Sequence, residues 1–202
     1  MKRFFDPEGL LWKPLGFIGE LVMLSLLWGV CSIALVTVGP ATAALYDTVV
    51  HALRRRDDNL FSRFFRTFRA ELKTGCLSAL LWLGLLALLF FSWRFLTGLD
   101  DPRFGMIAWV YAPVLALLLL GVLCWVFPLL SRFTFGFAAL NRTAARLALG
   151  NILRSLAAAL LTALGIVVCF LYTTPIIFVP GLVVWLWSYL MEPVFAGYES
   201  GS

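Results

Sequence analysis

Residues that could do chemistry are few in this chain, and most of them follow its first apolar run. Over a helix expected at Ala41–Arg56, the polar residues recur at helical spacing and form one stripe. They are Asp47, His51, Arg54, Arg55 and Asp58. The commoner arrangement for such a stripe is a helix that leaves the membrane with its polar side in water. The alternative is an ion-paired stripe that lines a cavity or grips a partner.

Catalytic and metal-binding motifs are absent from the sequence. It contains no phosphate-binding loop, no H-E-x-x-H and no G-x-S-x-G. The four cysteines lie in or beside separate apolar runs and show no C-x-x-C spacing. This pattern indicates that they are small apolar residues of the helices rather than disulfide partners or metal ligands. They are Cys31, Cys76, Cys124 and Cys169. A single histidine, His51, does not favour a zinc site. We therefore expect a protein that is not an enzyme and binds no cofactor or metal.

Composition predicts a polytopic membrane protein. Of 202 residues, 62% are hydrophobic and 13% are charged, whereas soluble domains carry about a quarter charged residues. We expect an all-α membrane helical bundle that forms one domain over residues 1–199, with residues 200–202 as an added tail. Five apolar runs are candidate transmembrane helices: Gly16–Val36, Gly75–Phe95, Met106–Leu130, Leu156–Tyr172 and Pro175–Leu190.

A break ends the first of these runs. Pro40 has no N–H group and disfavours helical geometry at Gly39, and proline suits the first turn of a new helix. Backbone broken near lipid must be shielded by protein or water, so other helices are expected to pack around this corner. The candidate structural or functional corner comprises Glu20, Thr37, Gly39, Pro40, Thr42 and Tyr46.

Two basic segments are expected to be amphipathic helices at the membrane surface. In Asn59–Thr74 a phenylalanine-rich face lies opposite four cations, Arg63, Arg66, Arg69 and Lys73. Such a helix places aromatic rings toward acyl chains and cations toward the phosphates of anionic lipids. Nucleic acid is not expected as the partner, because the spacing against an aromatic face favours the membrane. The interval Ser131–Ser155 is similar in pattern.

Three stretches carry a family resemblance. The residues between Leu26 and Tyr46 (LLW, CS, VTVG and ATAALY) resemble the signature of the YesL family of small bacterial membrane proteins, as do FFRTFRAELK at Phe64–Lys73 and VFPLLSRF at Val126–Phe133. Glu20, Ser25 and Ala34 depart from that pattern, which is expected to carry Asp, Asn and Pro there. The resemblance implies a bacterial inner-membrane protein in a setting of carbohydrate uptake and breakdown, and it supplies no mechanism.

These observations together favour an accessory or regulatory membrane protein that docks onto a sugar ABC importer without doing chemistry. The candidate partner or lipid surface comprises Asp47, His51, Arg54, Arg55, Arg56, Arg63, Arg66, Arg69 and Lys73. A stand-alone oligomeric transporter or channel is the alternative. In the five-span arrangement, the loops that carry most of the lysine and arginine residues are expected to be cytoplasmic.

Overall fold

The computed structural model describes residues 12–53, 59–99, 101–133, 135–172 and 177–199, and these residues form helices without a strand. The α-helices are α1 (Trp12–Cys31), α2 (Val38–Thr48), α3 (Leu60–Ala70), α4 (Leu72–Thr97), α5 (Pro102–Arg132), α6 (Phe137–Gly150), α7 (Ile152–Leu171) and α8 (Val179–Glu199). A 3₁₀ turn at Leu35–Thr37 precedes α2, and a π-helical turn at Val49–Leu53 follows it. The expectation of an all-helical chain is confirmed for the described residues.

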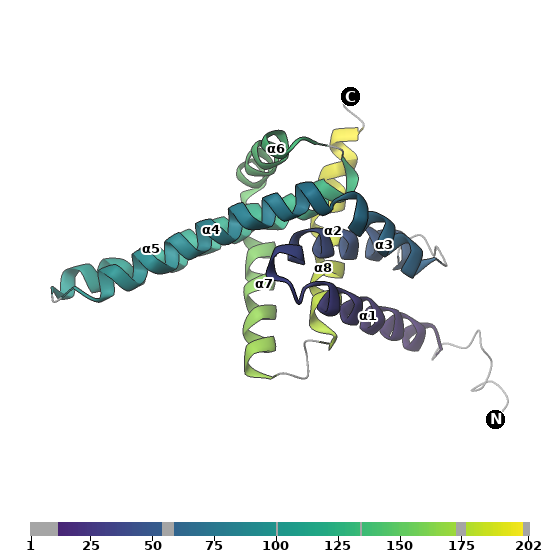
Figure 1. Ribbon diagram of the computed structural model, residues 1–202, viewed down its shortest axis with the longest axis horizontal. Helices are drawn as coiled ribbons and strands as arrows, with labels where there is room; N and C mark the ends of the chain where they lie inside the picture. Colours follow the sequence, from purple (N-terminus) through teal and green to yellow (C-terminus); the bar gives the residue numbers. More distant parts are fainter. Residues whose placement is uncertain (1–11, 54–58, 100, 134, 173–176, 200–202) are drawn as a thin grey trace.

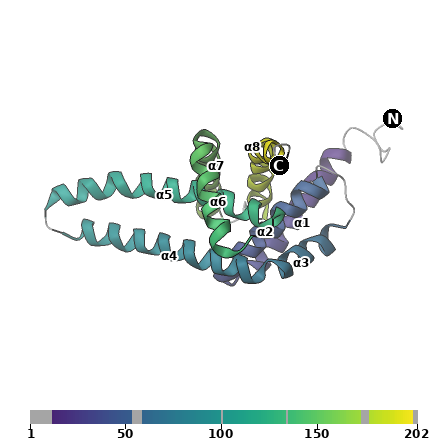
Figure 2. The same cartoon turned by 90° about the horizontal axis from the view of Figure 1, so that it is seen from above.

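The short helix α2 is the centre of the molecule (Figures 1 and 2). Every residue from Gly39 to Thr48 is buried, and the helix packs against α1, α3, α4, α5 and α8. Its first turns are rich in small residues, including Ala41, Ala43 and Ala44, which let neighbouring backbones approach closely. An 11-residue helix is too short to cross a hydrocarbon core of about 30 Å, so α2 serves as the common packing partner of the longer helices.

The break before α2 lies earlier than expected. We predicted a first span that continues to Val36, but α1 ends at Cys31 and the chain turns before α2 begins. The Thr37 hydroxyl group donates toward the carbonyl oxygens of Cys31 and Ala34, each at 2.6 Å. This side chain therefore satisfies carbonyl groups that the end of a helix leaves without partners. Pro40 lies in the first turn of α2, as expected.

Three of the described helices are long and apolar enough to cross a membrane: Leu72–Thr97, Arg103–Arg132 and Ile152–Leu171. They correspond to the second, third and fourth spans expected from the sequence. The first and fifth expected spans correspond to shorter apolar helices, Ile18–Cys31 and Val179–Phe195. The structure thus supports a helical membrane protein with three membrane-length helices.

Helices α4 and α5 form a long hairpin that projects from the body (Figures 1 and 2). Ser92 and Tyr111 hydroxyl groups lie 2.6 Å apart across it, and the Trp93 and Trp109 rings meet edge to face at 5.5 Å. Large apolar side chains near its tip are exposed, among them Phe91 at 68% and Met106 at 75%. Helices α7 and α8 run across the direction of this hairpin in Figure 1.

Both amphipathic helices pack part of their apolar face on the protein. The first is shorter than the predicted Asn59–Thr74, because it ends at Ala70 and α4 begins at Leu72. Phe64 is fully buried in the core, whereas Phe61 and Phe65 are exposed. In α6, Leu140, Ala144 and Leu147 are buried. The apolar faces therefore cover the helical core as well as providing the exposed aromatic rings expected at a membrane surface.

Candidate functional site

The carboxylate of Asp47, at the end of α2, is the centre of a buried polar cluster. Asp47 is 7% exposed. Arg63 on α3 donates to both of its oxygens, from Nε to Oδ2 at 3.0 Å and from Nη2 to Oδ1 at 3.3 Å. Thr67 Oγ1 donates to Oδ2 at 2.8 Å, and His51 Nδ1 lies 3.0 Å from Oδ1. We call these four residues the Asp47 cluster.

Local helix geometry places these partners. Arg63 and Thr67 are four residues apart on α3, so their side chains lie on the same face. His51 lies four residues after Asp47, in the π-helical turn. Its Nδ1 atom is also 3.0 Å from the Asp47 carbonyl oxygen. Both neighbouring oxygens are acceptors, which favours a form of the ring that carries hydrogen on Nδ1.

The Asp47 cluster joins α2 to α3 by charge. Removing a carboxylate from water is costly, and a bidentate arginine with a further hydroxyl donor offsets that cost. Both carboxylate oxygens already accept hydrogen bonds, which suits a fixed structural role better than proton transfer. The sequence interpretation that this stripe faces water is therefore wrong at Asp47, because α3 packs over α2 and covers it.

A second, partly buried polar group joins α2 to α8. Tyr46 donates its hydroxyl hydrogen to Glu192 Oε1 at 3.1 Å, and Arg132 at the end of α5 forms an ion pair with the same carboxylate. The Arg132 guanidinium also lies 5.1 Å from the centroid of the Phe195 ring, within the range of a cation–π contact. Consecutive residues of α2, Tyr46 and Asp47, thus anchor α8 and α3 respectively.

Sequence reasoning named Tyr46 but missed its partner Glu192 and the pairing of Glu192 with Arg132. The available signal was Glu192, an acidic residue just beyond the expected fifth span, which needs a partner if it lies among apolar side chains. Arg132 lies in the VFPLLSRF element and was the corresponding cation. Arg132 and Glu192 are sixty positions apart in sequence. Helical periodicity relates only residues a few positions apart, so it could not predict this pair.

The predicted corner is a site of close backbone packing. A Cβ atom added to Gly39 would lie 2.3 Å from the Gly75 carbonyl oxygen, and one added to Gly75 would lie 2.9 Å from Pro40. Thr42 accepts a hydrogen bond from Trp28 Nε1 at 3.0 Å and donates to the Val38 carbonyl oxygen at 2.7 Å. The expectation that other helices pack around this break is confirmed.

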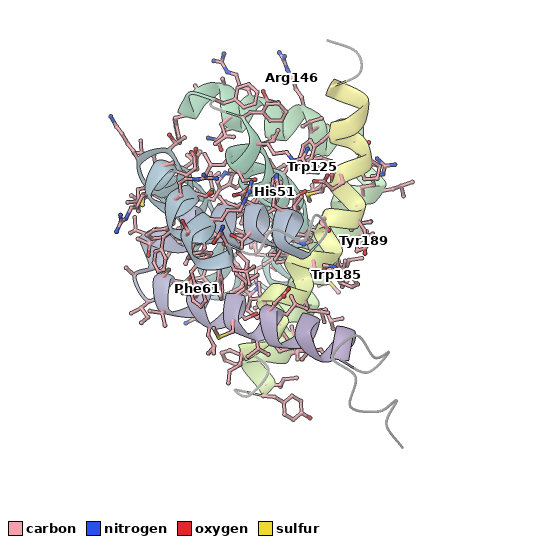
Figure 3. The ribbon with its side chains drawn as sticks, turned by 90° about the vertical axis from the view of Figure 1, so that its right-hand side faces the viewer. His51, Phe61, Trp125, Arg146, Trp185 and Tyr189 are labelled. Carbon is pink, nitrogen blue, oxygen red and sulfur yellow. The ribbon has the colours of Figure 1, made fainter. Side chains whose placement is uncertain are left out.

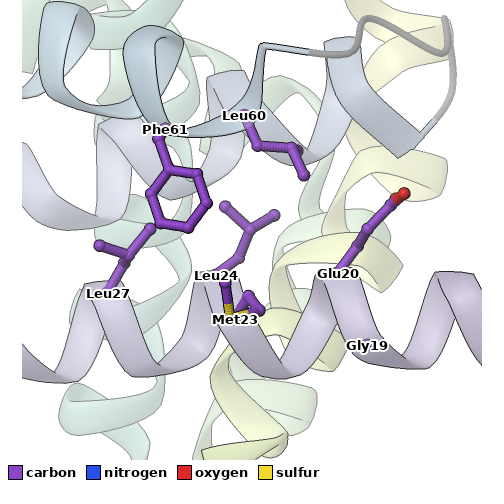
Figure 4. Close-up of a pocket in the computed structure, with 7 residues that line it drawn as sticks. All are labelled: Gly19, Glu20, Met23, Leu24, Leu27, Leu60 and Phe61. Atoms are coloured by element: carbon purple, nitrogen blue, oxygen red, sulfur yellow. The ribbon is translucent and has the colours of Figure 1, made fainter.

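Glu20 lies apart from the other corner residues. It lines a cavity of about 310 Å³ between α1 and α3, together with Gly19, Met23, Leu24, Leu27, Leu60 and Phe61 (Figure 4). None of the other five corner residues lines this cavity. The structure therefore divides the predicted corner into a Gly39–Gly75 contact and a separate half-buried carboxylate on α1.

The remaining residues of the predicted partner surface differ in exposure. Arg66, Arg69 and Lys73 are exposed, whereas Arg63 lies in the Asp47 cluster. Arg54, Arg55 and Arg56 lie outside the described residues. His51 lies near the middle of the molecule, and Arg146 of α6 lies at its edge (Figure 3).

The four cysteines are free thiols. Cys124 is buried, and the other three are partly exposed. Among the described residues, no group of three or more His, Cys, Asp or Glu side chains is arranged to hold a metal ion.

Comparison with known proteins gives one family match. Residues 21–93 match the model of a family described as protein of unknown function, DUF624. This segment begins in α1 and ends within α4, so it includes the whole Asp47 cluster and the Gly39–Gly75 contact. The match covers less than half of the chain. No curated protein and no solved structure matches the chain.

Proposed function

We propose that this chain is a YesL-like accessory membrane protein of the bacterial inner membrane that docks onto a sugar ABC importer and does no chemistry itself. The observation that carries the proposal is the way α3 is held. Arg63 and Thr67 fix one side of α3 to the buried Asp47 carboxylate. Arg66 and Arg69 of the same helix are exposed, and Lys73, also exposed, follows at the start of α4.

A helix held in this way is a rigid surface. The ion pair removes rotational freedom from α3, so its exposed cations are presented in a fixed arrangement, which reduces the cost of ordering on binding. Exposed Phe61 and Phe65 lie on the same helix and provide contacts to acyl chains. Two kinds of partner are complementary to this surface. One is an anionic lipid surface, near which each Lys or Arg contributes about 1 kcal/mol, and the other is an acidic face of a transporter subunit.

Charge reversal separates docking from general attraction to lipid. Arg66, Arg69 and Lys73 are changed together to Glu, and Arg142, Arg146 and Arg154, which are exposed in and after α6, are changed to Glu as the matched control. We expect the first triple variant to insert into the membrane but to lose co-purification of importer subunits and to reduce sugar uptake. The control variant is expected to retain both.

Two outcomes contradict the proposal. Equal losses in the two triple variants indicate a general effect of surface charge. Unchanged uptake and an unchanged set of co-purifying proteins in both remove the docking role. Sugar flux through the purified protein alone in liposomes then identifies the alternative, a stand-alone oligomeric transporter or channel.

A further inference from the structure

A second cavity lies between α2 and the membrane-length helices. Its volume is about 530 Å³, and its walls come from α1, α2, α4, α5, α7 and α8. Trp28 and Thr42 line one part of it, and Val183 and Trp187 of α8 line another. The volume is in the range of small-molecule sites, about 300–1,000 Å³. This cavity is separate from the Asp47 cluster, because none of the four cluster residues lines it.

Several polar side chains on its wall are hydrogen-bonded within the protein, whereas the buried Trp187 Nε1 has no hydrogen-bond partner among the described residues. Trp28 donates to Thr42, which donates in turn to the Val38 carbonyl oxygen. Thr162 donates to the Ala158 carbonyl oxygen at 2.7 Å, and its hydroxyl oxygen lies 3.4 Å from Cys124 Sγ. Sites for polar ligands present a few polar groups that fix the ligand's orientation. The lining here is predominantly hydrocarbon, which matches a ligand portion that needs no hydrogen bonds.

The cavity opens along α7. Two of its lining residues on this helix are strongly exposed, Ile166 at 56% and Phe170 at 91%. They are four residues apart and therefore lie on one face. Helices α7 and α8 pack closely at Gly165 of α7, where an added Cβ atom would lie 3.0 Å from Val183 Cγ2 of α8. The two helices therefore close one side of the cavity. Because α7 is long and apolar enough to cross a membrane, this opening faces the level of the acyl chains.

We infer that this cavity binds a single hydrocarbon chain of a membrane lipid, which enters beside Ile166 and Phe170 of α7 and lies against Val183 and Trp187 of α8. The lipid headgroup stays outside, since the lining is predominantly hydrocarbon. An empty apolar cavity stays dry, so the side chains that line it lack contacting atoms. The hydrocarbon chain of the lipid supplies those contacts. The site thus couples α7 and α8 to the composition of the surrounding lipid.

The test uses the purified full-length protein in lipid nanodiscs that contain phosphatidylcholine with a diazirine near the end of one acyl chain. Illumination followed by peptide mass spectrometry locates the cross-links. We expect cross-links on Val183 and Trp187, which line the cavity. Val183→Trp, which fills the cavity, should lose the cross-link at Trp187. Leu164→Trp is the matched control, because Leu164 lies on α7, is 62% exposed and does not line the cavity.

Two results overturn the inference. Cross-links confined to outward residues such as Leu164, and unchanged by Val183→Trp, indicate surrounding lipid only. Cross-links between two protein chains at the lining residues indicate that a second copy occupies the cavity.

A second experiment measures thiol reactivity of the wild-type protein and therefore does not depend on folding of the variant. Adding long-chain phosphatidylcholine to detergent-solubilised protein should slow the reaction of Cys169, which lines the cavity, with methyl methanethiosulfonate, and should leave Cys76 unchanged. Equal rates at Cys169 with and without the lipid contradict the inference.

Discussion

At the scale of single residues, the Asp47–Arg63 pair is an interaction whose loss is expected to be costly. Removing one partner of a buried ion pair leaves an uncompensated charge and costs about 3–5 kcal/mol, whereas replacing both partners by apolar residues is often close to neutral. Sequence reasoning named both residues as parts of an exposed surface. It missed their pairing because helical periodicity shows which residues share a face and does not show which other helix covers that face.

We therefore expect Asp47→Leu and Arg63→Met each to lower the free energy of unfolding by about 3 kcal/mol in detergent. The double variant should recover much of this loss, because neither charge is then left buried alone. Arg66→Met, at an exposed cation of the same helix, is the control and should change stability little. Chemical denaturation of the four proteins measures the coupling, and strictly additive losses would show that the pair does not interact energetically.

Glu71, between α3 and α4, provides a pH-dependent prediction. Partial burial raises the pKa of its carboxyl group above the ordinary value. The folded state therefore favours the protonated form, so this group stabilises the fold below its ordinary pKa of about 4.3, and that contribution is lost as pH rises through the raised value. Glu71→Gln is expected to increase the melting temperature at pH 7, with a gain that disappears near pH 4. Lys73→Gln should show no comparable change across this window, and a constant gain for Glu71→Gln would exclude the carboxyl as its origin.

At the scale of helices, the sequence predicted most elements because apolar runs and helical spacing are local signals. The positions of α4, α5, α6 and α7 follow from them, whereas α8 begins at Val179 and continues to Glu199, nine residues past the expected end at Leu190. The end of α1 was misplaced because Ile33, Ala34 and Val36 continue an apolar run through a turn, and an apolar composition does not distinguish a helix from a turn that protein shields. The full burial of α2 was likewise not predictable from its own residues, since it depends on five neighbouring helices.

The contact between α2 and α4 is expected to be intolerant of any side chain. Gly75→Ala places a Cβ atom 2.9 Å from the Pro40 ring, and neither backbone can yield without moving a helix. Gly84→Ala in the same helix meets nothing within 4 Å and should be neutral or stabilising by up to about 1 kcal/mol. The melting temperature and the expression level of Gly75→Ala are compared with those of Gly84→Ala, and both are expected to be lower for Gly75→Ala. Similar behaviour of both would show that the close approach does not limit stability.

At the scale of the whole molecule, the direction of the long helices bears on how many of them cross the bilayer. The 26-residue α4 is long enough, at about 1.5 Å per residue, to cross a core of about 30 Å. The α4–α5 hairpin and the α7–α8 pair run across one another in the structure (Figure 1), whereas transmembrane helices tilt by at most about 40° from the bilayer normal. The five-span arrangement therefore requires the hairpin to align more closely with α7 in a bilayer.

Cysteine accessibility tests this arrangement directly. In a background lacking the four native cysteines, single cysteines are placed at Asp101 and Tyr172, and also at the exposed cations Arg69 and Arg146. If five helices cross and the basic segments are cytoplasmic, an impermeant maleimide should label Asp101→Cys and Tyr172→Cys in intact cells. Arg69→Cys and Arg146→Cys should react only after permeabilisation.

If Asp101→Cys is labelled and Tyr172→Cys is not, the two turns lie on different sides of the membrane. This result would show that the α4–α5 hairpin crosses the bilayer and that the α7–α8 pair does not. Labelling of Arg69→Cys from outside would reverse the orientation and remove the α3 cations from the face at which cytoplasmic transporter subunits assemble.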